Sequence, residues 1–251
     1  MKAVTSLALA RSLVSLFVVT IFIGVGPKDS CGELVGMWLF EDSGDVIVDS
    51  SGNGHDGEMI GGVERTDEGK IGKGVRFDGV AAVVDIPDSD ALHSETFTLM
   101  SWFKLEAATG SWQTIFGKQS GGAGLIIEVA AGGVINTGFG GGWVCTGKTL
   151  IDDEEWHHAA SVFDGEAVRL YIDGSLDKEA VGGTRPDHNA LPLRIGGSPD
   201  IGEMFAGVID EVAFFDHPLT EQEIQGFMER LAAMEPAGKL VAAWGGIKAE
   251  H

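Results

Sequence analysis

The sequence predicts an all-β fold, a two-sheet antiparallel sandwich with one short helix near its C-terminus. Glycine makes up 38 of the 251 residues, and short apolar runs alternate with Gly, Asp and Asn, which is typical of many strands joined by tight turns. Two Asp-Gly pairs, at 164–165 and 173–174, separate alternating segments and indicate hairpins. A capping box from Thr220 to Glu223 predicts the start of a helix.

The first half of the chain is expected to hold strands at 34–40, 46–49, 75–78, 82–86 and 97–105. The longest of them, FTLMSWFKL at 97–105, has Phe97, Leu99 and Phe103 on one side. Its other side carries Met100 and Trp102. A strand with both faces covered belongs in the centre of a sheet of the sandwich.

The second half predicts strands at 112–118, 125–130, 134–138, 156–163, 168–172, 193–196 and 204–215. A helix is expected over 220–234. Its buried stripe is predicted to contain Ile224, Phe227, Met228 and Leu231.

One domain over 32–234 is expected, preceded by a targeting segment over 1–31 and followed by a tail over 235–251. Lys2 and Arg11 precede an apolar run at 13–25, the pattern of an export signal. The run is short for a membrane span, although an uncleaved anchor is the alternative. We therefore expect a secreted or cell-surface protein. Its two cysteines, Cys31 and Cys145, allow one disulfide at most and lack zinc spacing.

The formal net charge of −21 indicates which partners to expect. Such a surface repels DNA, RNA and anionic membranes, so we expect no nucleic-acid partner and no membrane contact beyond the N-terminal segment. Solubility explains an acidic surface, and divalent cation sites are the more specific interpretation.

One acid interrupts an apolar strand face. Read at period two, the strand at 204–215 has a face made of Met204, Ala206, Val208, Asp210, Val212 and Phe214. An ionised carboxylate there loses its hydration, which costs several kcal/mol. Asp210 should therefore meet an arginine, a set of N–H donors or a metal ion.

A glycine-punctuated loop over 49–57 places oxygen side chains at Asp49, Ser51 and Asn53. Alternating oxygen residues and glycines are typical of a loop that converges on calcium. The loop is not an EF-hand, because it lacks the Glu at the twelfth position and the flanking helices. A polar Asx-turn loop without metal is the alternative.

Several segments, taken in order, carry a family resemblance. They are WLFED at 38–42, DSSGNGHDG at 49–57, GKGVRFDG at 72–79, FTLMSWF at 97–103, WHH at 156–158, LYIDG at 170–174, IGG at 195–197, GVIDEV at 207–212 and LTEQEI at 219–224. Over about 34–228 the chain resembles the laminin-G-like, concanavalin A-like lectin/glucanase jelly-roll domains of secreted bacterial proteins. The resemblance implies two packed sheets and a structural Ca²⁺ ion. It makes Asp210 the anchoring ligand, with Glu41 or Asp42 and the loop residues Asp49, Ser51 and Asn53 as further oxygen donors.

Glycanases of this fold use two carboxylates across the scissile bond. The Glu-x-Asp-x-Glu spacing that the resemblance implies for glucanases is absent. Asp210 and Glu211 are adjacent, so they are expected to face opposite ways. No nucleophile-elbow or phosphate-loop motif occurs. We expect no catalysis, and a glycoside hydrolase with acids dispersed along the chain is the alternative.

Exposed aromatic rings are the remaining candidates for ligand contact, because sugars stack on such rings. Trp112, Trp143 and Tyr171 lie in or beside polar, glycine-rich segments, and core packing is the alternative for each. The expected function is an exported, non-catalytic binding module for a glycan, with a cell-surface protein as the alternative partner.

Overall fold

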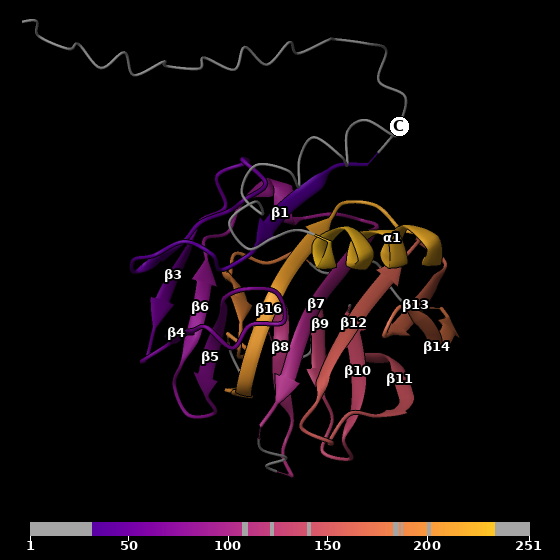
Figure 1. Ribbon diagram of the computed structural model, residues 1–251. Helices are drawn as coiled ribbons and strands as arrows, with labels where there is room; N and C mark the ends of the chain where they lie inside the picture. The colour runs from indigo at the N-terminus through magenta and orange to yellow at the C-terminus, as the bar shows by residue number, and fades with distance from the viewer. Residues whose placement is uncertain are drawn as a thin grey trace, which may run out of the picture. The chain divides into compact units, whose positions relative to one another are not determined.

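The computed structural model describes residues 32–233 except 107–109, 121–122, 140–141, 183–185, 187 and 200–201. Within these residues the chain forms two eight-stranded antiparallel sheets, one α-helix and one short 3₁₀ helix, η1 (Asp90–Leu92). This is the two-sheet jelly-roll sandwich that the sequence predicts (Figure 1).

Sheet A follows the order β14 (Ser175–Val181), β13 (Ala167–Ile172), β12 (Trp156–Phe163), β7 (Phe97–Leu105), β16 (Ala206–Phe215), β5 (Gly74–Asp78) and β4 (Glu64–Thr66), and β1 (Leu34–Trp38) also pairs with β16. Sheet B follows the order β11 (Gly142–Leu150), β10 (Val134–Phe139), β9 (Ala123–Val129), β8 (Gln113–Ser120), β15 (Leu193–Ile195), β6 (Val83–Ile86), β3 (Gly57–Ile60) and β2 (Val46–Ile47).

The main core lies between the sheets and is rich in aromatic rings. Phe97 packs edge-on against Phe139 of sheet B at a centroid distance of 5.6 Å. The rings of Trp38 and Phe116 also pack edge-on, with a centroid distance of 6.0 Å. Each fully buried side chain of this size contributes roughly 1.5–3 kcal/mol. β7 lies between β12 and β16, which confirms the prediction of a central strand.

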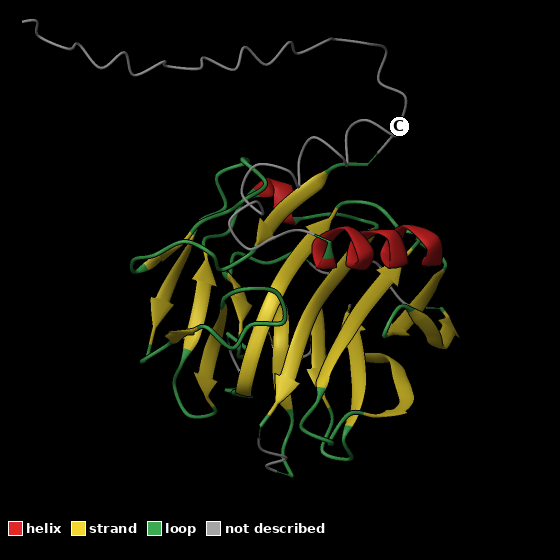
Figure 2. Cartoon of the chain, in the orientation of Figure 1, coloured by secondary structure: helices red, strands yellow, loops and turns green. Residues whose placement is uncertain are grey.

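Helix α1 (Glu221–Ala232) lies across the outer face of sheet A (Figure 2). The predicted capping box is present: the Thr220 hydroxyl accepts the N–H of Glu223, and the Glu223 carboxylate accepts the N–H of Thr220. Ile224, Phe227 and Leu231 are buried against the sheet, as the helical stripe predicts. The helix therefore closes this face with apolar side chains.

The expected single face of the last strand is wrong, because β16 contains a bulge. Asp210 pairs with Trp102 and Ala213 with Met100, so three steps along β16 match two along β7. Glu211, inside the bulge, has φ +54°. The extra residue reverses the alternation: Ile209 and Val212 both belong to the inter-sheet core. Simple alternation predicts that Asp210 and Glu211 face opposite ways. Both side chains are buried, with exposed fractions of 0% and 1%.

The predicted targeting segment 1–31, with Cys31, and the tail 235–251 lie outside the described residues. Cys145 is a buried free thiol, and burial raises its pKa to about 11. In the described part of the chain, no helix has the length and apolar character needed to cross a membrane.

Candidate functional site

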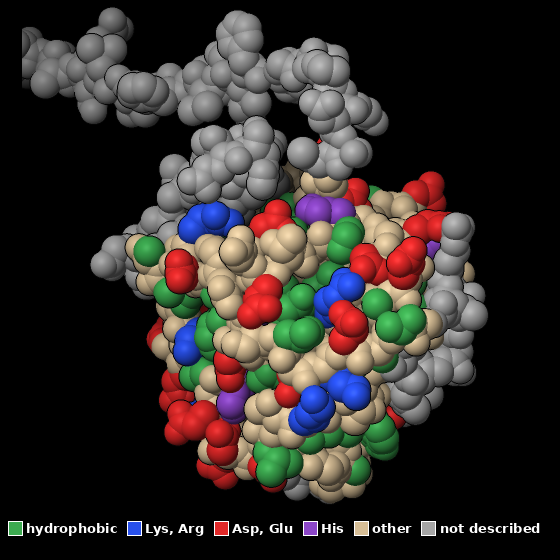
Figure 3. Space-filling model, turned by 90° about the vertical axis from the view of Figure 1, so that its right-hand side faces the viewer, with side chains coloured by type: hydrophobic (Ala, Val, Ile, Leu, Met, Phe, Trp, Pro, Cys, Tyr) green, Lys and Arg blue, Asp and Glu red, His purple; other side chains and the backbone are tan. Residues whose placement is uncertain are grey.

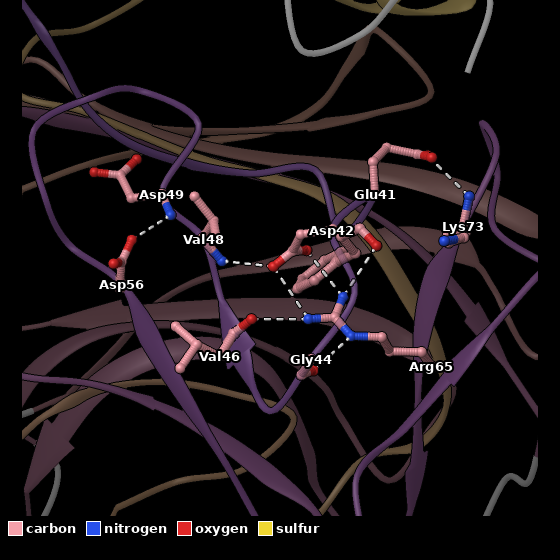
Figure 4. Close-up of polar contacts among 10 residues, drawn as sticks. Glu41, Asp42, Gly44, Val46, Val48, Asp49, Asp56, Arg65 and Lys73 are labelled. Carbon is pink, nitrogen blue, oxygen red and sulfur yellow. Dashed lines mark hydrogen bonds and ion pairs between the residues drawn. The ribbon is translucent and has the colours of Figure 1, made fainter. Parts of the chain in front are cut away.

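Arg65 on β4 organises the acidic loop between β1 and β2 (Figure 4). Its guanidinium meets both carboxylate oxygens of Asp42, at 2.9 and 3.1 Å. The remaining N–H groups bond the carbonyls of Phe40 (3.1 Å), Gly44 (3.1 Å) and Val46 (2.8 Å). All five guanidinium donors are thus used, and the charge of Asp42 is neutralised by a cation of the chain itself.

The glycine-punctuated loop is tied to β1. Asp49, which is 5% exposed, accepts the backbone N–H of Met37 at 3.0 Å and that of Ser51 at 2.8 Å through Oδ1. Its Oδ2 accepts from the N–H of His55 at 3.0 Å. The Ser51 hydroxyl and the Asn53 amide donate to the carbonyl of Val35, at 3.2 and 2.9 Å. These bonds are those of an Asx-turn loop.

Glu41 and Asp210 both border the segment 71–73. Asp210 Oδ2 accepts the N–H of Ile71 at 3.0 Å, so an N–H donor is among its partners, as the desolvation argument required. Glu41 Oε1 accepts the N–H of Lys73 at 2.9 Å (Figure 4). Gly72, next to Lys73, has φ +69°, a left-handed backbone conformation that favours glycine.

The six predicted calcium ligands therefore fall into three groups. Asp42 pairs with Arg65. Asp49, Ser51 and Asn53 bind the loop to the first strand. Glu41 and Asp210 meet the 71–73 segment. The described residues contain no group of three or more His, Cys, Asp or Glu side chains that could hold a metal ion. Calcium binding at these residues stays a prediction.

The three predicted aromatic contacts lie in different surroundings. Tyr171 is 5% exposed and packs in the cluster beneath α1, and burial raises the pKa of its phenol. The structure therefore does not place this ring on the surface. Trp112 is half-buried just before β8, and the side chain of Trp143 lies outside what is described. Ligand contact at these rings stays a prediction.

Sheet B carries a polar row that the motif search missed. Thr114, Glu128, Asn136 and Thr146 lie opposite one another on the four neighbouring strands β8 to β11. Ile127 and Val129, the neighbours of Glu128 in the chain, belong to the inter-sheet core. Because side chains alternate along a strand, the row faces the outer side of sheet B. Thr114, Glu128 and Asn136 are nevertheless 0% exposed.

A second carboxyl group completes this row. The N–H of Thr114 donates to the carbonyl of Glu203 at 2.9 Å, which places Glu203 beside the row. Burial and the neighbouring Glu203 carboxyl raise the pKa of Glu128 to about 9, and burial also raises the pKa of Glu203. The sequence offered one signal, an acid inside the apolar run LIIEV at 125–129, the same kind of signal that singled out Asp210.

Solved structures with the same fold include carbohydrate-related and toxin domains. Domain 4 of AbnA, a GH43 extracellular arabinanase from Geobacillus stearothermophilus in complex with arabinotriose, is 24% identical, with a TM-score of 0.64 over 78% of this chain and 98% of that one. The binding domain of Paraclostridial Mosquitocidal Protein 1 is 16% identical, with a TM-score of 0.66 over 78% and 52%. Trypanosoma rangeli sialidase in complex with sialic acid is 17% identical, with a TM-score of 0.61 over 80% and 33%.

The chain thus spans nearly all of the arabinanase domain, about half of the toxin domain and a third of the sialidase. At these identities the likeness shows the fold. A search of curated proteins gave no match. The family model described as concanavalin A-like lectin/glucanases superfamily matches residues 78–225, more than half of the 251 residues. The chain therefore belongs to the concanavalin A-like lectin/glucanases superfamily.

Proposed function

We propose that this domain is a non-catalytic module that binds carbohydrate outside the cytoplasm. The observation that carries the proposal is its likeness to an arabinanase domain solved with arabinotriose, over 98% of that domain. That enzyme is extracellular, in keeping with the export signal predicted at 1–31. The acidic surface favours a neutral ligand over a polyanion. On the face drawn in Figure 3, acidic side chains are spread among polar and hydrophobic ones.

The test is calorimetric titration of the purified domain with arabinotriose and a panel of neutral oligosaccharides. Saturable binding to at least one of them is expected, and a heat-unfolded sample is the control. No binding to any glycan, together with capture of one cell-surface protein, would replace the proposal with the protein-partner alternative. A botulinum neurotoxin binding domain of the same fold was solved with rat synaptotagmin II, which supports that alternative.

Glycoside hydrolysis is the second candidate, because Glu203 is a partly buried carboxyl group with a raised pKa, as a general acid requires. Glu128 is 0% exposed and adjoins Glu203 directly, so the second carboxylate across a scissile bond would be another acid of the chain. Release of reducing ends from a polysaccharide, abolished in Glu203→Gln, would establish this activity. No release from any substrate of the panel would leave binding as the function.

A structural calcium ion is a further part of the proposal. Glu41 and Asp210 would hold it at the 71–73 segment, and the ion would supply charge neutralisation there. Calcium should raise the thermal midpoint, since an ion that binds only the folded state stabilises it. Glu41→Gln should remove this response, whereas Asp42→Asn should keep it, because Asp42 is bound by Arg65. An identical midpoint in calcium and in chelator would contradict the proposal.

A further inference from the structure

The polar row of sheet B leaves one buried oxygen unexplained. Glu128 Oε1 accepts a hydrogen bond from the Asn136 amide at 3.2 Å. Its Oε2 is shielded from solvent and accepts from no N–H or O–H group in the structure as described, so the neighbouring Glu203 carboxyl can bond it only through a shared proton. A buried carboxyl oxygen that depends on a shared proton costs stability, so native proteins rarely keep such a pair without a functional reason.

The rest of the row forms a chain of contacts that leads outward. The Thr146 hydroxyl donates to Asn136 Oδ1 at 2.6 Å, and Thr146 is exposed. At the other end, the Thr114 hydroxyl lies 3.5 Å from Glu203 Oε2, a weak hydrogen bond. Glu203 is also partly buried. A ligand at the surface can therefore reach Glu203 directly, whereas Glu128 lies beneath it.

The chemistry of two adjoining acids indicates what such a ligand is. Two carboxylates that face each other in a low dielectric cannot both ionise, so the pair keeps one proton at neutral pH. A half-protonated pair has one O–H donor and several acceptor oxygens. A sugar hydroxyl also donates and accepts, so it matches the pair.

We propose that Glu203 and Glu128, with Thr114 and Asn136, form a subsite on the outer face of sheet B that binds the hydroxyl groups of a neutral glycan. The inference rests on the proposed carbohydrate-binding function. Glu203 contacts the sugar. Glu128 is a positioning residue, which holds the shared proton against Glu203 and is itself oriented by Asn136.

The experiment titrates the full domain and three variants with arabinotriose and the neutral panel. Glu203→Gln should weaken binding by about tenfold or more. A loss of this size corresponds to the free energy of one hydrogen bond to a charged group. Glu58→Gln is the control, since Glu58 is an exposed acid of the same sheet, and its affinity should stay within about twofold of the unsubstituted domain.

Glu128→Gln separates positioning from simple stability. In the unsubstituted domain, affinity should fall as the pH rises past about 9, where the pair loses its last proton. The amide introduced by Glu128→Gln donates at every pH, so affinity in this variant should no longer fall there. Circular dichroism checks that each variant folds. If Glu203→Gln does not fold, Glu203→Asp replaces it, because it keeps the charge on a shorter side chain. Weaker binding is again expected.

The outcomes distinguish this inference from the function on which it rests. If a glycan binds and the Glu203 variant keeps its full affinity, the subsite is overturned while the binding function stands. If no glycan binds the unsubstituted domain, the function itself fails. Saturable binding of calcium chloride alone that Glu203→Gln removes would make the pair a cation site and would also overturn the inference.

Discussion

The two outer faces of the sandwich are closed in opposite ways. On sheet A, α1 buries Phe227 against Phe215 at a ring-centroid distance of 5.8 Å, within an apolar cluster that includes Met100 and Ala160. On sheet B, the central row contains Thr114, Glu128 and Asn136, equally buried but polar. Apolar burial stabilises the fold and needs no further explanation. A buried acid pair costs stability, so its presence points to function.

The largest expected effect is on the apolar face. Phe227→Ala should lower the free energy of unfolding by about 3–5 kcal/mol, because it removes a buried ring and leaves a cavity beneath α1. Urea denaturation measures the loss. Gln222→Ala, at an exposed position of the same helix, is the control and should change stability by less than about 0.5 kcal/mol. Equal effects of the two substitutions would mean that α1 does not close this face.

The next effect concerns the loop that leads from sheet A to sheet B. Arg65→Met should cost about 2–4 kcal/mol, since it removes five hydrogen bonds and leaves the largely buried Asp42 without its cation. Arg76→Met is the matched control. Arg76 also pairs with two acids, Glu68 and Glu106, but in a more exposed position, so its loss should be below about 1 kcal/mol. Similar losses would show that the Arg65 contacts add nothing beyond an ordinary surface pair.

The buried acid pair on the outer face of sheet B should make the free energy of unfolding depend on pH. The pKa of Glu128 is about 9 in the folded state and 4.5 when unperturbed, so unfolding releases a proton between these values. The stabilisation that Glu128 contributes is full below about pH 4.5 and is lost as the pH rises towards 9, by at most about 1.4 kcal/mol per pH unit. Glu128→Gln should flatten this dependence in denaturation curves, and Glu58→Gln should not. An unchanged slope would contradict the shared proton.

A smaller pH effect is expected at His157, near the start of β12. Burial lowers the pKa of His157, but hydrogen bonds to Asp173 (2.9 Å) and Asp153 (3.0 Å) outweigh it, so the pKa is raised above 6.5. The stabilisation that protonated His157 contributes is therefore full below about pH 6.5. It is lost as the pH rises through the folded-state pKa of His157. His157→Asn should remove a difference of about 1 kcal/mol or less between pH 6 and pH 8. If the difference persists, another group produces it.

Much of the fold was predictable because it is encoded locally. The turn at Asp173 and Gly174, with φ of +51° and +76°, follows from the Asp-Gly pair. The capping box and apolar stripe of α1 lie within a dozen residues, and strands β7 and β12 match their predicted limits. The unpredicted strands β3, β4, β11 and β14 lie at or beside sheet edges. Edge strands need no regular apolar face, so their sequences lack the alternation that predicts a strand.

Local pattern alone thus determined the helix, the Asp-Gly turns and the strands with a regular apolar face. Only the tertiary structure decided the bulge of β16, because a bulge exists only relative to the partner strand β7. It also decided that Asp42 pairs with Arg65. Lastly, it brought together Glu128 and Glu203, which are distant in sequence. The charge state of a buried acid depends on its neighbours in space, and only the packing of the strands supplies those neighbours.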